Sequence, residues 1–354
     1  MARRTTPIPH VVEGPYLRDI LDQPRALEDT LRRLEAPAAL EGVARRLRDG
    51  ELHRVVLTGM GSSHLGLVPL HLRLVGAGLL PLTVEASELL HYQRRLLDED
   101  ALLVLVSQSG RSAEILRVLE AVRGRGVTTL AVTNTADSPL AREATATVLT
   151  HAGEEATVSC KTYLAAQMAL AWLGEVLTGG DRDGALAVLG ETIPGAASYL
   201  ASWRSHVEWL AERLDGVRAV YYAGRGPSLA AACSAGLITK ESTHRPSEGM
   251  GSAAFRHGPM EMLDAGVFLL AFAGAAPTRA LNEALVADVR AAGARAFLAA
   301  EDVPEPALRL PPVADLARPV VELLPVEMIT LALAALDGRE AGRFERVTKV
   351  TATE

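Results

Sequence analysis

The sequence has few of the features that mark secreted, metal-binding or membrane proteins. It holds two cysteines, Cys160 and Cys233, which lie far apart without the spacing of metal ligands, so we expect neither a disulfide framework nor a zinc site. Residues 1–9 have no apolar core of signal-peptide length. The most apolar stretches, such as residues 101–106 and 267–273, are far too short to span a bilayer. We therefore expect a cytoplasmic protein with no membrane partner.

Neither sign of charge dominates the chain. Its 36 lysines and arginines and 43 aspartates and glutamates are interspersed, with a formal net charge of −7, which gives no electrostatic reason to expect nucleic acid as a partner. Hydrophobic residues make up 49% and charged residues 22%, the balance of a globular protein. The length of 354 residues is sufficient for two domains with good cores.

A pattern of apolar strand, glycine turn and helix occurs twice in the chain. Residues 54–63 show it first, and residues 219–228 repeat it. A second apolar segment, residues 101–110, matches residues 266–274 at nearly the same offset, and each is followed by an amphipathic helix and another strand. Apolar strands that alternate with helices predict βαβ units. We therefore expect an α/β protein with two tandem domains, each a doubly wound, mostly parallel sheet flanked by helices.

The same pattern suggests where the parts of the chain begin and end. We expect an N-terminal helical lead-in at residues 1–34, a first domain at residues 35–190 and a second at residues 205–340, followed by a C-terminal tail at residues 341–354.

A hydroxyl-rich turn follows the apolar strand at residues 101–106. In a doubly wound sheet, ligands bind beyond the carboxyl ends of the strands, where backbone N–H groups point outward. The equivalent turn of the second half, residues 271–276, has no hydroxyl, whereas serines that served only as helix caps should be wanted in both copies. The contrast favours a phosphate site in the first domain. The turn offers Ser107, Gln108, Ser109, Gly110 and Ser112.

A glycine turn at residues 59–64 lies nearby in this scheme. It matches a dinucleotide-binding fingerprint poorly, because the third glycine arrives only at Gly66 and the acidic residue expected on the ribose is unclear. A tight turn that adds Ser62 and Ser63 to the phosphate site fits better. His64 is either a ligand contact or simply exposed.

The second half contains a dense charged patch at residues 239–248, which continues to residues 255–259. Such a run is usually a solvated face, but the glycine-rich stretch 249–252 and the turn at Gly258 favour a constrained loop, and constrained loops often carry function. The patch holds a carboxylate that could move a proton and an imidazole that could help to open a ring, which aldose–ketose chemistry requires.

At these residues the sequence resembles the SIS (sugar isomerase) family. It is most similar to the isomerase half of the glucosamine-6-phosphate synthases, the glutamine–fructose-6-phosphate amidotransferases, with further likeness to glucosamine-6-phosphate deaminases and fructosamine deglycases. The resemblance covers nearly the whole chain. Its motifs stand in order at residues 17–24, 61–63, 84–88, 107–110, 133–134, 151–155, 159–161, 224–226, 240–241, 257–259 and 349–354.

The resemblance implies roles for particular residues. Glu241 would shuttle a proton between C1 and C2 of the sugar, and His257 would open the ring, reaching the site from the neighbouring subunit of a homodimer whose sites lie at the subunit interface. Lys349 would form a Schiff base with the ketose, and the tail would close over the site as a lid. No metal or redox cofactor is expected. The residues that would hold the sugar phosphate are Ser62, Ser63, Ser107, Gln108, Ser109, Ser112, Ser159 and Lys161.

The chain also departs from the synthase pattern. It begins where the isomerase half would begin, so we expect no glutaminase activity. Ile238 replaces a family lysine three residues before the glutamate, and Arg111 replaces an acidic residue in the phosphate turn. We therefore expect a related active site adapted to another substrate or direction.

Three hypotheses follow. The first is a glucosamine-6-phosphate deaminase that gives fructose 6-phosphate and ammonia. The second is a fructosamine-6-phosphate deglycase, for which Ile238 could make room for a bulkier amine. The third is a non-catalytic sugar-phosphate sensor, against which the retained glutamate, histidine and lysine count. A substrate panel separates the three.

Overall fold

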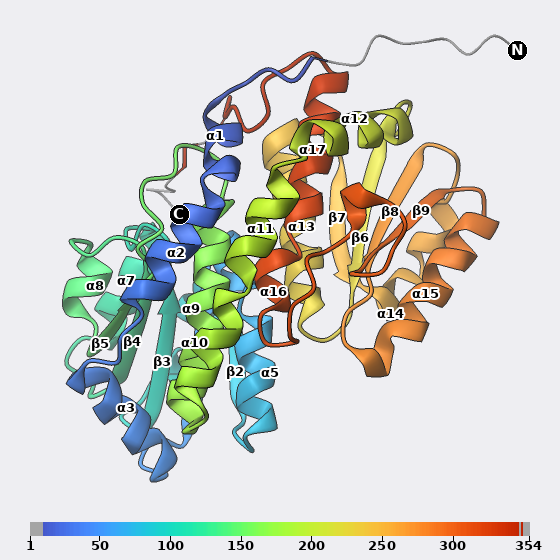
Figure 1. The fold of residues 1–354 in the computed structure, drawn as a ribbon. Coiled ribbons are helices and arrows are strands. Elements are labelled where there is room, and N and C mark those ends of the chain that lie inside the picture. The colour runs from blue at the N-terminus through green and yellow to red at the C-terminus, as the bar shows by residue number, and fades with distance from the viewer. Residues whose placement is uncertain (1–9, 347, 350–354) are drawn as a thin grey trace, which may run out of the picture.

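Two parallel β-sheets, each flanked by helices, organise the chain (Figure 1). We describe a computed structural model, in which residues 10–346 and 348–349 are placed. The first sheet has the order β2-β1-β3-β4-β5 and the second the order β7-β6-β8-β9, with all neighbouring strands parallel. The strands are β1 (Arg54–Gly59), β2 (Pro81–Glu85), β3 (Ala101–Val106), β4 (Thr128–Thr133), β5 (Ala146–Leu149), β6 (Ala219–Gly224), β7 (Ser247–Gly251), β8 (Val267–Phe272) and β9 (Arg295–Ala299).

The helices cover both faces of the two sheets and connect them. Those before and within the first sheet are α1 (Pro15–Leu21), α2 (Gln23–Arg33), α3 (Ala38–Arg48), α4 (Gly61–Leu65), α5 (Val68–Gly76), α6 (Ala86–Tyr92), α7 (Ala113–Val122) and α8 (Pro139–Glu143). The connecting helices are α9 (Lys161–Thr178), α10 (Arg182–Gly190), α11 (Thr192–Leu200) and α12 (Trp203–Leu214). Those of the second sheet are α13 (Ser228–Thr243), α14 (Ser252–Phe255), α15 (Ala276–Ala291), α16 (Arg318–Val321) and α17 (Leu324–Leu336), with short 3-10 turns η1 (Arg94–Leu96), η2 (Pro259–Met262) and η3 (Pro306–Leu308).

The predicted fold class and the internal duplication are confirmed. Strands β2-β1-β3-β4 of the first sheet correspond in order to β7-β6-β8-β9 of the second. The middle strands β3 and β8 are buried at every position, because helices cover both faces of each sheet. In both sheets the chain crosses from one side of the first strand to the other. Ligands bind at such a switch point in open α/β sheets, and in the first sheet it lies between β1 and β3.

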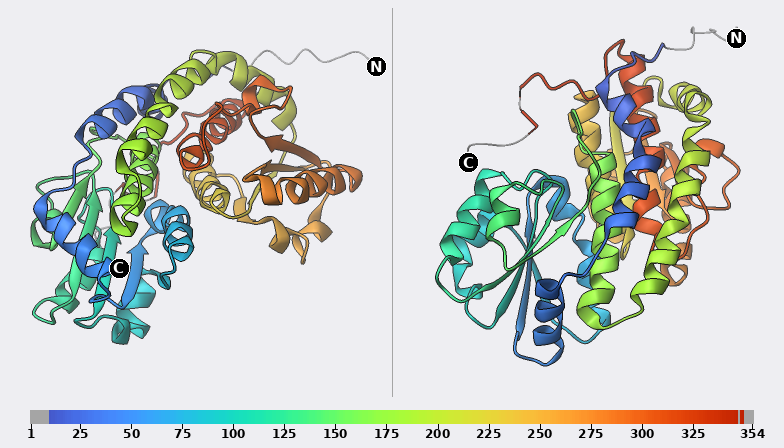
Figure 2. Two further views of the ribbon diagram at one scale, coloured as in Figure 1. Left: turned by 60° about the horizontal axis from the view of Figure 1, so that its bottom comes forward. Right: turned by 60° about the vertical axis from the view of Figure 1, so that its left-hand side comes forward.

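One contact between the two units positions the candidate site. Helix α13 packs on β6 and β7 of its own sheet and also contacts α4 of the first unit. One hydrophobic core contains side chains from both sheets, which joins the two units into one body. The chain after α17 returns from the second unit toward the first (Figure 2). The end of α13 and the returning segment therefore both approach the carboxyl edge of the first sheet.

The charged patch predicted to be a constrained loop has regular structure instead. Residues 239–243 form the last turn of α13, and residues 247–251 form the edge strand β7. A side chain at Gly249 would collide with the backbone of Ala232, and one at Gly236 would collide with the backbone of Gly249. The glycines therefore serve the close packing of α13 on β7, and the loop prediction was wrong for that reason.

One apolar segment, Arg318–Leu336, passes a test for membrane spanning by length and composition. It is nearly all buried inside the protein, where α16 and α17 form part of the core, which is the ordinary position of such a segment in a core helix.

A buried carboxyl group joins α13 to α16. Glu322 is fully buried, and its Oε1 accepts a hydrogen bond of 2.5 Å from the Ser228 hydroxyl at the start of α13. Its second oxygen has no partner among the described residues. Burial raises the pKa of Glu322 to about 7, against the ordinary 4.5. The folded protein therefore holds this proton more tightly than the unfolded chain does.

This difference predicts how the pH dependence of stability changes in Glu322→Gln. The free energy of unfolding of the parent should fall as pH rises from about 4.5 to about 7, and the contribution of Glu322 to that fall is about 3 kcal/mol. The variant cannot ionise, so its stability relative to the parent should improve by up to that amount between pH 5 and pH 8. Urea denaturation at pH 5 and pH 8 measures the free energy of unfolding, with exposed Glu191→Gln as the control. An equal change of this free energy between the two pH values in all three proteins would contradict the prediction.

Candidate functional site

A pocket of about 190 Å³ opens at the carboxyl ends of β1 and β3, where α13 and the C-terminal segment meet the first sheet. It brings together most of the residues predicted from the sequence. Its polar and charged lining residues are Ser62, Ser63, Ser107, Gln108, Ser109, Ser112, Glu155, Thr157, Ser159, Glu241 and Lys349.

The hydroxyl-rich turn forms one wall of this pocket. Ser107 follows β3 directly, and its Oγ accepts a hydrogen bond from the Gly110 backbone N–H at 3.2 Å. Gly110 has φ +60°, and a side chain there would collide with Ser138, so the turn requires glycine. The turn ends at Ser112, the N-cap residue of α7, whose Oγ lies 3.4 Å from that of Ser107.

The Ser112 hydroxyl is not used as a helix cap. It makes no capping hydrogen bond to α7, whereas Ser138, the N-cap residue of α8, accepts one of 3.2 Å from the Ala141 backbone N–H. Backbone N–H groups at the start of a helix, together with hydroxyl groups that line the same pocket, suit an anion. The geometry therefore agrees with a phosphate group at this turn.

Glu241 faces the serines from the last turn of α13. Partial burial raises its pKa to about 7, although the positive charges of Lys349 and Lys240 act in the opposite direction and the negative charge of Glu155 adds to the rise. A carboxyl group with such a pKa can accept and return protons near neutral pH. Its position in a pocket beside a lysine makes it the strongest candidate for acid–base chemistry here.

Lys349 comes from the C-terminal segment, far from the other pocket residues in sequence. Its ammonium group donates hydrogen bonds to Glu155 Oε2 at 2.8 Å and to the Thr157 carbonyl oxygen at 2.7 Å. Its side chain is only 22% exposed, so it is not the freely solvated lysine that its place near the end of the chain would suggest. The rest of the predicted tail, residue 347 and residues 350–354, lies outside the described residues.

Glu155 was not predicted as a site residue. It stood only within the motif at residues 151–155, where its neighbour Glu154 offered an equal carboxylate and nothing in the sequence distinguished the two. The structure buries Glu155 against the start of α9 and leaves Glu154 exposed. Leu237 and Phe344, two of the apolar lining residues, carried no signal in the sequence because apolar residues are ordinary in helices and tails.

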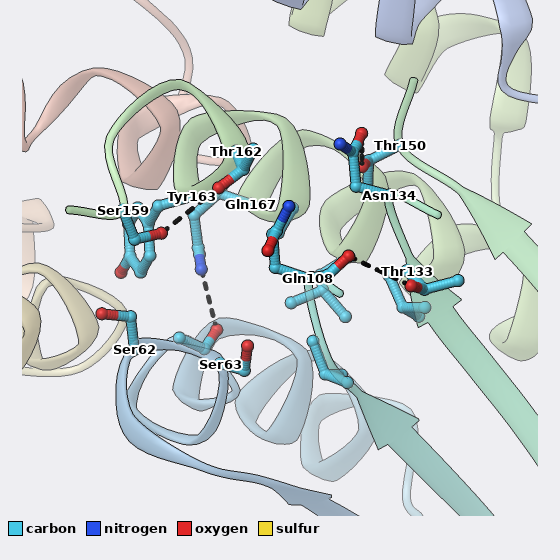
Figure 3. Close-up of a pocket in the computed structure, with 15 residues that line it drawn as sticks. Ser62, Ser63, Gln108, Thr133, Asn134, Thr150, Ser159, Thr162, Tyr163 and Gln167 are labelled. Atoms are coloured by element: carbon cyan, nitrogen blue, oxygen red, sulfur yellow. Dashed lines mark hydrogen bonds between the residues drawn. The ribbon is translucent and has the colours of Figure 1, made fainter. Parts of the chain in front are cut away.

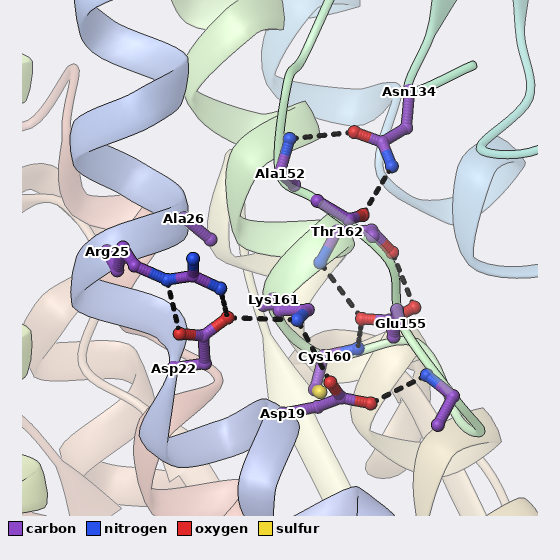
Figure 4. Close-up of polar contacts among 12 residues, drawn as sticks. Asp19, Asp22, Arg25, Ala26, Asn134, Ala152, Glu155, Cys160, Lys161 and Thr162 are labelled. Carbon is purple, nitrogen blue, oxygen red and sulfur yellow. Dashed lines mark hydrogen bonds and ion pairs between the residues drawn. The ribbon is translucent and has the colours of Figure 1, made fainter.

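Lys161 needs a correction, because the structure holds it away from the pocket. Its ammonium group lies 3.0 Å from Asp19 Oδ1 and 3.0 Å from Asp22 Oδ2, and its side chain is 5% exposed (Figure 4). Asp22 also binds Arg25 through two hydrogen bonds of 2.7 Å. Lys161 therefore ties the N-terminal helices to α9 and has no charge free for a phosphate group.

Two further expectations are not met within one chain. His257 is exposed between α14 and η2 and is not among the pocket residues, so its role as a residue supplied by a partner subunit stays a prediction.

Ile238 is fully buried in the core, and its neighbour Leu237 lines the pocket instead. The argument that Ile238 makes room for a substrate group is therefore wrong. Arg111 turns away toward Asp137.

A second, smaller cavity of about 20 Å³ adjoins the pocket (Figure 3). It shares Ser62, Ser63, Gln108 and Ser159 with the pocket and extends toward α9. There the Gln167 amide donates a hydrogen bond of 3.0 Å to the Gly66 carbonyl oxygen. Its size is that of about one water molecule, so it extends the polar surface behind the phosphate turn and cannot hold a sugar.

Comparison with known proteins agrees with this geometry. Residues 51–173, which span the first sheet and most of α9, match the SIS domain family. The chain carries a SIS domain. The serines of its pocket all belong to this SIS domain, whereas Glu241 and Lys349 lie beyond the matched residues.

The SIS domain and the second unit are found together in related proteins. The chain is 31% identical over 360 residues to the glutamine–fructose-6-phosphate aminotransferase (isomerizing) of Symbiobacterium thermophilum, covering 96% of this chain and 59% of the relative. The chain thus spans less than two thirds of that relative. The C-terminal domain of the glucosamine–fructose-6-phosphate aminotransferase of Francisella tularensis has a similar structure, with a TM-score of 0.81 at 22% identity over 94% of this chain and 98% of that one.

The glucosamine-6-phosphate deaminase of Thermotoga maritima also shares the fold. Its structure matches with a TM-score of 0.74 and 17% identity, covering 95% of this chain and 99% of that one. At such identities the two structural matches show the fold alone. Both share with this chain an arrangement that covers more than nine tenths of its length.

The two N-cap serines allow a matched test of the phosphate site. Ser112→Ala should weaken binding of a sugar phosphate about 10- to 100-fold, because a hydrogen bond to a charged group contributes about 1.5–3 kcal/mol. Its thermal stability should change little, since Ser112 makes no cap bond. The control Ser138→Ala should lower stability by about 1 kcal/mol and leave binding unchanged. Calorimetry and thermal melts measure both; unaltered affinity in Ser112→Ala would contradict the phosphate assignment.

Proposed function

We propose that the protein is an aldose–ketose isomerase-type enzyme that acts on an amino-sugar phosphate, and that it converts glucosamine 6-phosphate and water to fructose 6-phosphate and ammonia. The observation that carries the proposal is the Glu241 carboxyl group, with its pKa near 7, beside Lys349 and opposite a turn of serines in one pocket. The serines would anchor the phosphate, which leaves the other end of an open-chain sugar toward Glu241.

The chemistry needs one base that moves a proton between two carbons, while a second proton passes through water from the C2 nitrogen to the C1 oxygen. In the open-chain aldose, Glu241 would remove the proton from C2 and return it to C1, so that the C1 aldehyde becomes an alcohol and the C2 amine becomes an imine. Water then adds to the C2 imine and ammonia leaves, which gives the ketone of fructose 6-phosphate. The proton taken by the carboxylate is the proton given back, so the residue returns to its starting state.

Lys349 would act at C2, the carbon that carries the imine. Its amine could exchange with the C2 imine, releasing ammonia and forming a Schiff base that water hydrolyses. Its position beside Glu155 in the pocket supports this role, because the amine and Glu241 line the same space.

A partner subunit would supply the ring-opening group. His257 is exposed and lies outside the pocket of its own chain, as expected for a residue that completes the site of a second copy in a homodimer. We propose that the enzyme works as such a dimer in the cytoplasm.

Substitution of the base tests the mechanism directly. Glu241→Gln should lower kcat by about 10²- to 10⁴-fold, because general base catalysis contributes about that much. It should leave the affinity for glucosamine 6-phosphate nearly intact, since the serines hold the phosphate. Coupled assay of fructose 6-phosphate and calorimetry give the two quantities. Full turnover in this variant would refute the proposed mechanism.

The pH–rate profile tests the ionisation of the same group. The base must be deprotonated, so kcat/KM should rise with pH through an apparent pKa of about 7 and level off above it. This rise with pH, the acid limb of the profile, should be absent from the residual activity of Glu241→Gln. A profile in the parent that is flat between pH 5.5 and 8 would show that Glu241 is not the titrating base.

Complementation tests the contribution of the partner. Glu241→Gln and His257→Asn should each be inactive alone. If each site takes Glu241 from one subunit and His257 from the other, a refolded equimolar mixture should recover about a quarter of parental activity, because half of the dimers are mixed and each holds one intact site. Parental activity of His257→Asn alone would place His257 outside the site, and no recovery in a mixture shown to exchange subunits would show that the two residues of a site do not come from different subunits.

A substrate panel separates the proposed activity from its rivals. The protein is incubated with hexosamine and fructosamine phosphates while ammonia, amino acid and ketose phosphate are monitored together. Ammonia and fructose 6-phosphate from glucosamine 6-phosphate support the deaminase. Release of an amino acid without ammonia identifies a deglycase, and tight binding with no turnover identifies a sensor.

A further inference from the structure

Four groups donate hydrogen bonds to the buried carboxylate of Glu155. Its side chain has no exposed surface. Oε1 accepts from the Cys160 and Thr162 backbone N–H groups at 2.9 and 3.0 Å, and Oε2 accepts from the Thr162 hydroxyl at 2.6 Å. These three contacts hold the carboxylate rigidly against the first turn of α9, the long helix beneath the pocket.

The fourth contact of Glu155 comes from a distant part of the chain. Lys349, 194 residues away in sequence, donates to Oε2 at 2.8 Å, and its second contact is the Thr157 carbonyl oxygen in the same loop. An ammonium group has three N–H donors. Within the described residues, two of them are therefore directed to this loop.

Lys349 shares the pocket with two carboxyl groups. Glu155 and Glu241 both line the pocket with it, and the positive charge of Lys349 acts on Glu241 from within that space. A flexible lysine side chain would otherwise pair with whichever carboxylate it reached. The rigid, buried position of Glu155 selects one of the two.

We infer that Glu155 is a positioning residue, which fixes the amine of Lys349 at the wall of the pocket and keeps it from pairing with Glu241. In this arrangement Glu241 stays free to move the substrate proton, while Lys349 stays within reach of the ligand. The catalytic consequence rests on the proposed function, but the docking of Lys349 on Glu155 does not.

Glu155→Gln tests this role, because the amide keeps the size of the side chain but not its charge. Its matched control is Glu175→Gln, which removes another carboxylate near α9's far end, bound to Arg73 at 2.7 and 2.9 Å and outside the pocket. Glu155→Asp restores the charge on a shorter side chain. Circular dichroism and thermal melts establish that each variant is folded.

The first measurement does not depend on turnover. Acetylation of Lys349 by acetic anhydride, followed by mass spectrometry, reports the accessibility of its amine in the protein without substrate. Glu155→Gln should be labelled at Lys349 severalfold faster than the parent, Glu155→Asp should lie between them, and Glu175→Gln should match the parent. Equal labelling in the Gln variant and the parent would overturn the inference, whatever the substrate proves to be.

The second measurement uses the pH–rate profile. Glu155 raises the pKa of Glu241, and Lys349 released from Glu155 would approach Glu241 and lower it, so the acid limb of kcat/KM should move to lower pH in Glu155→Gln. A purely structural defect would lower the rate without moving the limb. The charged groups that act on Glu241 are Lys240 on its own helix and Glu155 and Lys349 in the pocket wall, and α4, which packs against α13, carries His64.

The outcomes separate the two claims. If the parent turns over no hexosamine phosphate, the proposed function falls, but the labelling of Lys349 still decides the role of Glu155. A second outcome is an active parent in which Glu155→Gln and Glu175→Gln show the same acetylation rate of Lys349 and the same acid limb of kcat/KM. In that case Glu155 is only a helix-capping residue. If the Gln variant does not fold, Lys349→Met supplies the test. It should move the limb to higher pH by removing a cation near Glu241, and an unmoved limb would contradict the arrangement.

Discussion

The candidate site depends on the packing of α13 against α4, because this contact joins a phosphate-type turn in one unit to a carboxyl group in the other. Helix α13 can lie close on β7 only because Gly236 and Gly249 have no side chains where the two backbones meet. That close approach sets the direction of the helix, whose C-terminal part then carries Leu237 and Glu241 into the pocket. A shift of one element would separate the acid–base group from the serines, so the site and the interface between units have the same structural basis.

Buried carboxyl groups are used in different ways around this interface. Glu155 has four hydrogen-bond donors, which offset the cost of burying its charge. Glu322 has a single donor for two oxygens, and burial raises its pKa. Glu241 lies between these extremes, partly buried and facing cations in a pocket. The environment, and not the residue type, therefore decides which of these glutamates is structural and which can exchange a proton at neutral pH.

The course of the strands and the serine turn could be predicted from the sequence, because buried parallel strands are short apolar runs and the residues after them meet at one edge of the sheet. The comparison of the two halves was informative because the equivalent turn of the second sheet, residues 271–276, has no hydroxyl group. Other signals were misleading. Gly249 suggested a constrained loop but serves close packing. Lys161, close to Ser159 in sequence, suggested an anion ligand, but the fold pairs it with Asp19 and Asp22.

What the sequence by itself determined is the fold class, the duplication and the polar turn of the first unit, since each follows from local patterns in neighbouring residues. Only the tertiary structure decided which charged residues share a pocket. Glu155, Glu241 and Lys349 are separated by more than a hundred residues in two of their three pairings, and their contact depends on how two units pack and where the last segment returns. The family resemblance had already suggested Glu241 and Lys349 for one site. Hydrogen bonds act over a few ångströms of space, so no local pattern along the chain could have shown that Glu155 holds Lys349.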